Sequence, residues 1–89
     1  MKHKVALVLV EWVDSRVPIA RWAMLRDIVV DACQPAKCQT VGWLIKRTKD
    51  AVLIAQSFAD SASQVNGVIT IATKAIVKIH KLKEPKVKL

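Results

Sequence analysis

The sequence predicts a mainly β fold, a small and highly curved five-stranded barrel with one short helix after the first strand. Two observations carry this prediction. Five short segments rich in valine and isoleucine are separated by turn-forming residues, and Gly42 interrupts the second segment, where a strand glycine is typical of a sharp bend. The fourth and fifth segments are joined by a very short link, Lys74 and Ala75.

The first strand is expected over residues 4–13, where valine dominates and Asp14 with Ser15 forms the following turn or helix cap. A polar turn at 48–50 predicts that the second and third strands form a hairpin, and Asn66 with Gly67 indicates a turn before the fourth. The four later strands are expected over 37–47, 51–57, 68–73 and 76–82.

The joint at 73–75 has the length of a single tight helical turn. Such a turn connects the last two strands of Src-homology-3-like and Sm-like barrels. We therefore expect a barrel of one of these two types.

The predicted helix covers residues 18–30. Pro18 suits the first turn of a helix, and the apolar side chains that follow recur at steps of three and four residues, at Trp22, Leu25, Val29 and Ala32. This spacing predicts an amphipathic helix that packs on the sheet or covers one end of the barrel. The alternative is an irregular loop that ends in a strand at 28–30.

Length and composition predict one folded domain. A chain of 89 residues supports a single core, and a hydrophobic content of 53% excludes intrinsic disorder. We assign residues 1–84 to the barrel domain and 85–89 to a basic C-terminal tail.

The charge is strongly positive. Fifteen Lys and Arg against seven Asp and Glu give a net charge of +8, which attracts anionic partners such as nucleotides, nucleic acids and acidic proteins. Six of the lysines follow residue 73, against the single acid Glu84. The alternative is that these charges only keep the protein soluble.

Catalytic and metal-binding patterns are absent from the sequence. Cys33 and Cys38 match neither a CxxC redox motif nor zinc-site spacing, and there is no GxSxG, HExxH or glycine-rich phosphate loop. The pair Asp14 and Ser15 is more typical of a turn than of a catalytic dyad. We expect a protein that is not an enzyme and uses no cofactor or metal.

No membrane segment is expected. The apolar run at 5–10 ends at Glu11, so it is shorter than the core of a signal peptide and far shorter than a membrane span. We expect a soluble, intracellular protein without a membrane partner.

Aromatic rings beside cations are the groups that bind a nucleobase and its phosphates. Trp43, close to Lys46 and Arg47, is the first candidate platform, and Trp12 near Asp14 is the second. The alternative is that these tryptophans are core or interface residues. The candidate ligand-binding residues are Trp43, Trp12, Asp14, Lys46, Arg47, Lys78 and His80.

Several strands are apolar on both faces, so a single copy would leave part of the outer barrel surface uncovered. Such surfaces are typical of association sites. We therefore expect a homo-oligomer.

The order of several short blocks resembles a group of small, uncharacterised bacteriophage proteins with the pattern VxWxDS, W, TVGWL, VxLA, GxxxIPxxxIxxI. The matching blocks are EWVDS at 11–15, Trp22, TVGWLI at 40–45, VLIA at 52–55, and the stretches 67–71 and 74–79. The chain departs from the pattern at Ala72 and Thr73, where proline-containing pairs are expected, and residues 17–30 are more apolar. The resemblance implies a phage protein that acts in the cytoplasm of an infected bacterium and counters host defence.

Three functions follow as hypotheses. The first is sequestration of a small anionic nucleotide by an oligomer, in a pocket between barrel subunits. The second is Sm-like binding of RNA or single-stranded DNA. The third is inhibition of a host enzyme by direct protein contact.

Overall fold

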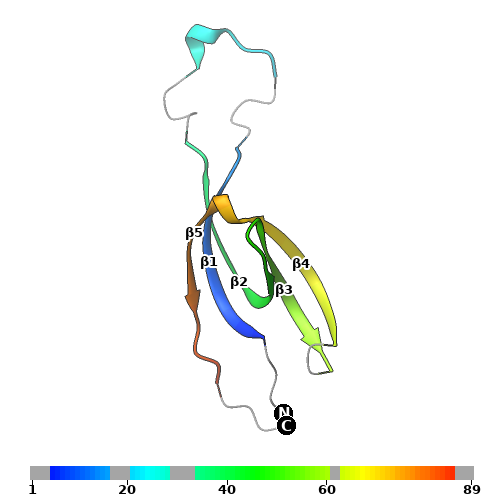
Figure 1. The fold of residues 1–89 in the computed structure, drawn as a ribbon. Coiled ribbons are helices and arrows are strands. Elements are labelled where there is room, and N and C mark those ends of the chain that lie inside the picture. Colours follow the sequence, from blue (N-terminus) through cyan, green and yellow to red (C-terminus); the bar gives the residue numbers. More distant parts are fainter. Residues whose placement is uncertain (1–4, 17–20, 29–33, 61–62, 86–89) are drawn as a thin grey trace.

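The structure is a computed structural model that describes residues 5–16, 21–28, 34–60 and 63–85. These residues form five strands and two short 3₁₀ turns (Figure 1). In chain order the elements are β1 (Ala6–Asp14), η1 (Leu25–Asp27), β2 (Ala36–Arg47), β3 (Ala51–Ala59), β4 (Gln64–Ala72), η3 (Thr73–Ala75) and β5 (Ile76–Lys81). The mainly β prediction is confirmed, and so is the tight turn at Thr73–Ala75.

All five strands belong to one antiparallel sheet in the order β4-β3-β2-β1-β5. The β1–β2 pair is regular over nine residues, from Ala6 opposite Leu44 to Asp14 opposite Ala36. Only Trp43 to Arg47 of β2 pair with β3, so the first part of β2 pairs with β1 alone.

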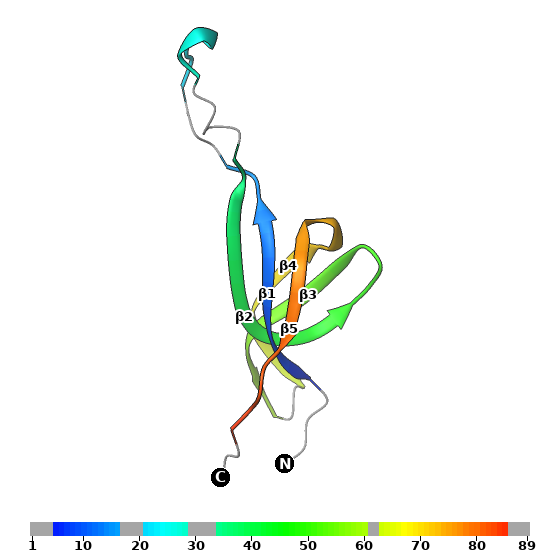
Figure 2. The ribbon, with the colours of Figure 1, turned by 90° about the vertical axis from the view of Figure 1, so that its left-hand side faces the viewer.

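The prediction of a closed barrel is wrong. β4 and β5 are the two edges of the sheet, and within the described ranges they are not paired with each other. The sheet is nevertheless strongly curved, as expected, because β2 and β3 bend so that the two ends of the sheet approach each other (Figure 2). Ile71 of the edge strand β4 belongs to the buried core cluster, and Ile79 of the edge strand β5 packs against that cluster.

The core lies inside this bend. Valine and isoleucine side chains of β1, β3 and β4 are fully buried there, and partly buried residues of β2, β5 and η3 surround them. Burying each such side chain stabilises the fold by about 1.5–3 kcal/mol. The buried cluster consists of Val8, Val10, Val52, Ile54 and Ile71.

Gly42 explains how β2 passes so close to β3. A Cβ atom at this position would lie 2.5 Å from Cγ2 of Ile54 and 2.7 Å from the carbonyl oxygen of Ala55. Only glycine allows this approach, which supports the interpretation of Gly42 as the bend of the second strand.

The predicted turn at Asn66 and Gly67 is wrong, because both residues lie inside β4. The chain reverses earlier, at Asp60, whose φ is 52° and whose carbonyl oxygen accepts a hydrogen bond from the Ser63 N–H at 3.2 Å. Gly67 uses its conformational freedom within the strand, with a φ of 66° next to Gln56. Positive φ at a glycine is therefore compatible with strand pairing here.

The helix expected over 18–30 is also wrong for the residues described. Residues 21–28, which we call the arm segment, contain only the single 3₁₀ turn η1, and the rest of the prediction (18–20, 29 and 30) lies outside the described residues. An isolated helix of this length is unstable unless its apolar face packs against something. Every residue of the arm segment is exposed, and Trp22 is completely exposed, so no such packing exists.

The arm segment lies beyond the ends of β1 and β2, away from the other strands in both views (Figures 1 and 2). The radius of gyration is correspondingly large. It is 17.5 Å, whereas a compact chain of this length has about 12 Å.

Candidate ligand-binding face

One side of the sheet, away from the core, brings together polar groups from β1, β2 and β5. Residues directly opposite each other on antiparallel strands share a side. Glu11 lies opposite Gln39 of β2 and Lys78 of β5, and Leu9 lies opposite Val41 and His80. We call this side the outer face; it comprises the odd-numbered residues of 7–13 and 37–43, with Lys78 and His80.

Glu11 and His80 form the centre of the outer face. Nε2 of His80 lies 2.8 Å from Oε2 of Glu11, so the ring N–H donates a hydrogen bond to the carboxylate and joins β5 to β1. Both side chains are 38% exposed. The hydrogen bond and charge of His80 lower the pKa of Glu11, aided by a hydrogen bond from Gln39 and the charge of Lys78, against a smaller opposing effect of burial.

A groove of about 700 Å³ opens at the end of the outer face nearest the arm segment. The groove lies beside an irregularity between β1 and β5, whose register shifts between Glu11 and Trp12. The shift makes Val77 an extra residue between Ile76 and Lys78, and Val77 is 70% exposed. The groove is lined by Glu11, Trp12, Val13, Lys37, Cys38, Gln39 and Val77.

Trp43 occupies the opposite end of the outer face, across from Leu7. Its ring packs edge to face against Phe58, with 4.6 Å between ring centroids and an interplanar angle of 86°. Trp43 lies four positions after Gln39 along β2, which corresponds to about 13 Å. The exposed side chain of Val41 lies between them.

The structure therefore brings three predicted site residues to one face: Trp43, Lys78 and His80. Trp12 has a different position. By alternation its ring lies on the core side, where Nε1 donates a hydrogen bond to Oγ1 of Thr40 at 2.9 Å and the ring packs against the core. This arrangement gives Trp12 a structural role, although the residue also borders the groove.

Asp14, Lys46 and Arg47 lie away from this group. Asp14 is exposed at the end of β1, and its Oδ1 accepts the backbone N–H of Ser15 at 2.8 Å, as in a turn. Lys46 and Arg47 are exposed at the far end of β2, beyond a register shift against β3 between Leu44 and Lys46.

Sequence reasoning missed Glu11, Lys37 and Gln39 as parts of the same face. One signal pointed to Glu11, which interrupts the apolar run 5–13. Lys37 and Gln39 give no such signal, because only the pairing register of β1 and β2 places them beside it.

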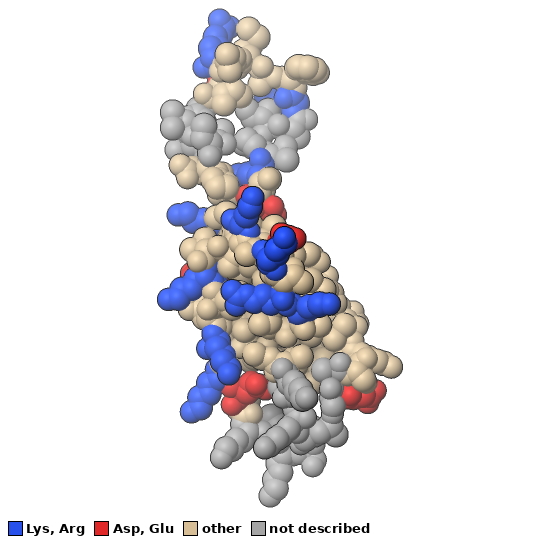
Figure 3. Space-filling model, viewed as in Figure 1, with Lys and Arg blue, Asp and Glu red and all other residues tan. Residues whose placement is uncertain are grey.

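The surface around the sheet is positive. Figure 3 shows Lys and Arg side chains along the left-hand side, where β5 lies in the same view, and in a band across the middle of the molecule. Acidic side chains lie beside some of them, but more Lys and Arg than Asp and Glu are seen in this view.

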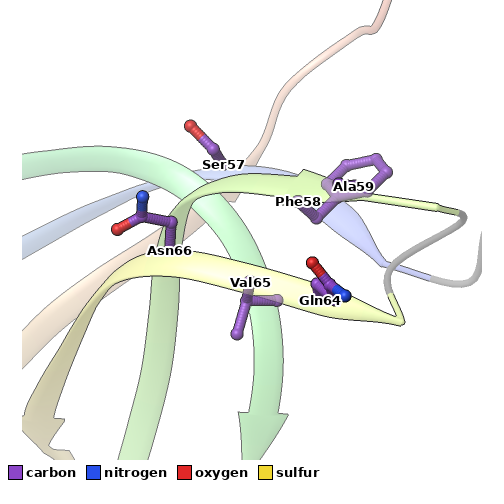
Figure 4. A pocket seen from close by; sticks show the side chains of 6 residues that line it. All are labelled: Ser57, Phe58, Ala59, Gln64, Val65 and Asn66. Atoms are coloured by element: carbon purple, nitrogen blue, oxygen red, sulfur yellow. The ribbon is translucent and has the colours of Figure 1, made fainter.

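A second, smaller depression of about 350 Å³ lies where β3 ends and β4 begins (Figure 4). Its walls carry hydroxyl and amide groups but no charge, so it offers nothing to neutralise an anion. The residues around it are Ser57, Phe58, Ala59, Gln64, Val65 and Asn66.

Among the residues that the structure describes, no three His, Cys, Asp or Glu side chains gather as metal ligands. Cys33 lies outside the described residues. Over the same described ranges, no helix has the length and apolar composition needed to cross a membrane.

Comparisons of the chain with protein-family models, with curated proteins and with solved structures find no match.

Proposed function

We propose that the protein is a non-enzymatic binding protein that holds a small anionic, nucleotide-type ligand on its outer face. One observation carries the proposal: the pairing register of β1, β2 and β5 collects an aromatic ring, several cations and an ionised carboxylate on a single side of the sheet. A nucleotide presents a base, hydroxyl groups and phosphates. An aromatic ring can stack on the base, a carboxylate can accept hydrogen bonds from the hydroxyl groups, and cations can pair with the phosphates.

Each group has a matching partner. The base packs against Trp43 or the apolar side chain of Val41, since stacking on an aromatic ring depends little on base identity. Ribose hydroxyls or an exocyclic amine donate to Glu11, as carboxylates do in dinucleotide-binding proteins. Phosphate oxygens accept hydrogen bonds from Lys37 and Lys78, on either side of Glu11.

The net charge of +8 adds long-range attraction for such a ligand. The resemblance to small phage proteins supplies the biological setting: a homo-oligomer that sequesters a nucleotide signal in the infected bacterium and so counters host defence.

The test is thermal unfolding of the purified protein against linear and cyclic nucleotides, including ADP-ribose derivatives. A ligand that binds the folded form raises the midpoint by mass action. Lys78→Ala and Glu11→Gln are expected to weaken the shift. Lys81→Ala is the matched control, because Lys81 lies on the same strand but opposite Val8, on the other side.

Two results would contradict the proposal. The first is a panel in which no nucleotide raises the midpoint. The second is a Lys78→Ala variant that binds as tightly as the unchanged protein while Lys81→Ala does not.

A second candidate function, binding of RNA or single-stranded DNA, is favoured by one observation. The backbone N–H of Thr73 donates to the carbonyl oxygen of Asp50 at 2.9 Å, which holds η3 against the turn that follows β2. Four exposed cations lie on or beside these two adjoining turns: Lys46, Arg47, Lys49 and Lys74.

Salt dependence distinguishes the two functions. Affinity for nucleic acid falls steeply with salt because bound phosphates release counterions. Each of Lys49→Ala and Lys74→Ala is expected to reduce the slope of log K against log salt by about one. Absence of any oligonucleotide binding at low salt excludes this second function.

A further inference from the structure

The hairpin formed by β3 and β4 is almost free of charged side chains. Residues 51–72 contain only one, Asp60, although the whole chain has fifteen Lys and Arg and seven Asp and Glu. Depletion of charge marks the central part of surfaces that other protein chains cover. The hairpin is therefore the part of this basic protein that another protein chain can approach without facing cations.

β4 forms one margin of the sheet, opposite β5 (Figure 1). Within the described residues it pairs only with β3, so one row of its backbone N–H and C=O groups has no strand beside it. The first five residues of the strand, 64–68, are all exposed, and they include Val65 and Val68. Natural edge strands are commonly protected by charged residues or proline, and Gln64–Ala72 contains neither. This edge is thus open to pairing with a further strand.

A second copy of the chain fits this edge. Antiparallel strands related by a two-fold axis contribute the same donors and acceptors, so β4 is complementary to itself. The charges that flank the strand agree with this arrangement. Asp60 precedes β4 and Lys74 follows it, and both are exposed. Antiparallel pairing brings the acid of one copy and the lysine of the other to the same end of the pair, where they attract each other.

The other edge does not suit such pairing. β5 carries Lys78, His80 and Lys81, and pairing it with a second β5 would bring like charges together across the strands. Two copies with a net charge of +8 each repel each other at most approaches. An uncharged edge strand is the place where they meet with the least repulsion.

We propose that two copies of the chain associate by antiparallel pairing of β4 with β4, about a two-fold axis near the middle of the strand. Main-chain hydrogen bonds hold the two strands together, as in the addition of a peptide strand to a sheet edge. The outer face belongs to β1, β2 and β5 and stays open in this dimer. The inference therefore gives the proposed homo-oligomer its interface, and it holds whether or not the outer face binds a nucleotide.

The experiment measures the mass of the full chain by sedimentation equilibrium, without any ligand. A dimer is expected. Two double variants, Asn66→Lys with Thr70→Lys and Asn66→Glu with Thr70→Glu, are each expected to be monomeric. A two-fold axis at Asn66, Val68 or Thr70 places introduced charges of the two copies directly opposite each other, and like charges in that position destabilise strand pairing.

Net charge is controlled in two ways. The lysine variant raises the net charge and the glutamate variant lowers it, so loss of the dimer in both follows from the position of the charges. Ser15→Lys with Gln34→Lys adds the same charge as the lysine variant at exposed positions outside the strands, and it should remain dimeric.

Mixing the lysine and glutamate variants gives the decisive result. Opposite charges then face each other across the axis, so a heterodimer should form although neither variant associates with itself. Unfolded variants would not recover in this way, so rescue on mixing also shows that both variants fold.

Several outcomes overturn the inference: an unchanged chain that stays monomeric at its highest soluble concentration, variants that remain dimeric, a control that loses the dimer, or variants that do not associate on mixing. A glutamate variant that associates more strongly than the unchanged chain also overturns it, because β4 would then pair with the basic strand β5 of the next copy. A dimer that binds no nucleotide keeps the inference and excludes the proposed ligand. A monomer that binds a nucleotide does the reverse.

Discussion

Nε2 of His80 lies 2.8 Å from Oε2 of Glu11, although 69 positions separate the two residues in the sequence. The contact joins the last strand of the sheet to the first, on the side that faces away from the core. It also fixes the orientation of the one carboxylate on the outer face. The stability of this contact therefore responds to pH.

The first prediction concerns that response. The pKa of Glu11 is lowered from its usual 4.5 in the folded protein, mainly by the hydrogen bond from His80. A carboxylate with a lowered pKa stabilises the fold above its unfolded-state pKa, and this contribution is lost as the pH falls through the folded-state pKa. The urea concentration at the midpoint of unfolding should therefore decrease as the pH falls through the folded-state pKa of Glu11.

His80→Gln and Glu11→Gln are each expected to reduce this part of the pH dependence. The double variant should behave like either single variant, because both changes remove the same interaction. Additive effects of the two changes would show that the residues act separately.

The second prediction concerns the bend in β2. Gly42→Ala is expected to lower the free energy of unfolding by about 1–3 kcal/mol, because the new methyl group overlaps Ile54 and the backbone of Ala55. Denaturant unfolding measures the loss. The exposed Lys46→Ala change on the same strand should alter stability by no more than about 0.5 kcal/mol, and equal losses in both variants would exclude the crowding explanation.

The third prediction concerns Trp12. Thr40→Val removes the acceptor of the indole N–H while keeping a side chain of similar shape, so unfolding should become easier by about 1 kcal/mol. Once Trp12 has been replaced by phenylalanine, Thr40→Val should have a much smaller effect. An unchanged midpoint for Thr40→Val alone would mean that the hydrogen bond contributes nothing to stability.

The fourth prediction concerns the edge-to-face pair of Trp43 and Phe58. Phe58→Leu keeps an apolar side chain but removes the ring, and it should cost about 0.5–1.5 kcal/mol beyond the change in burial. Phe58→Tyr retains the ring and serves as the control. If the proposed ligand stacks on Trp43, the leucine variant should also bind it more weakly. Equal affinities of the two variants for the ligand would show that the ring of Phe58 does not contribute to binding.

Local patterns predicted most of the strands well. Runs of valine and isoleucine identify the strands because β-branched side chains favour extended backbone, and the three-residue joint at Thr73–Ala75 leaves room only for a tight turn. Features that depend on distant partners were predicted less well. Closure of the barrel requires β4 and β5 to meet, and no local pattern states whether backbone groups or side chains such as Ile71 and Ile79 fill that space.

The helix prediction failed for a related reason. The apolar spacing at Trp22 and Leu25 suits a helix, but a short helix needs a surface to pack against, and the described chain provides none. The candidate site shows the same limit. Residue types indicated Trp43, Lys78 and His80, whereas their association with Glu11 follows from strand register, which depends on how distant segments pair.

The open sheet leaves two strand edges that differ in their chemistry. β5 carries three basic residues, Lys78, His80 and Lys81, and charge on an edge strand discourages the addition of further strands. β4, from Gln64 to Ala72, has no charged residue and contains several β-branched ones. Its free backbone groups are thus the most exposed template for aggregation in the described chain, and a lysine introduced there should raise the concentration at which the protein remains in solution.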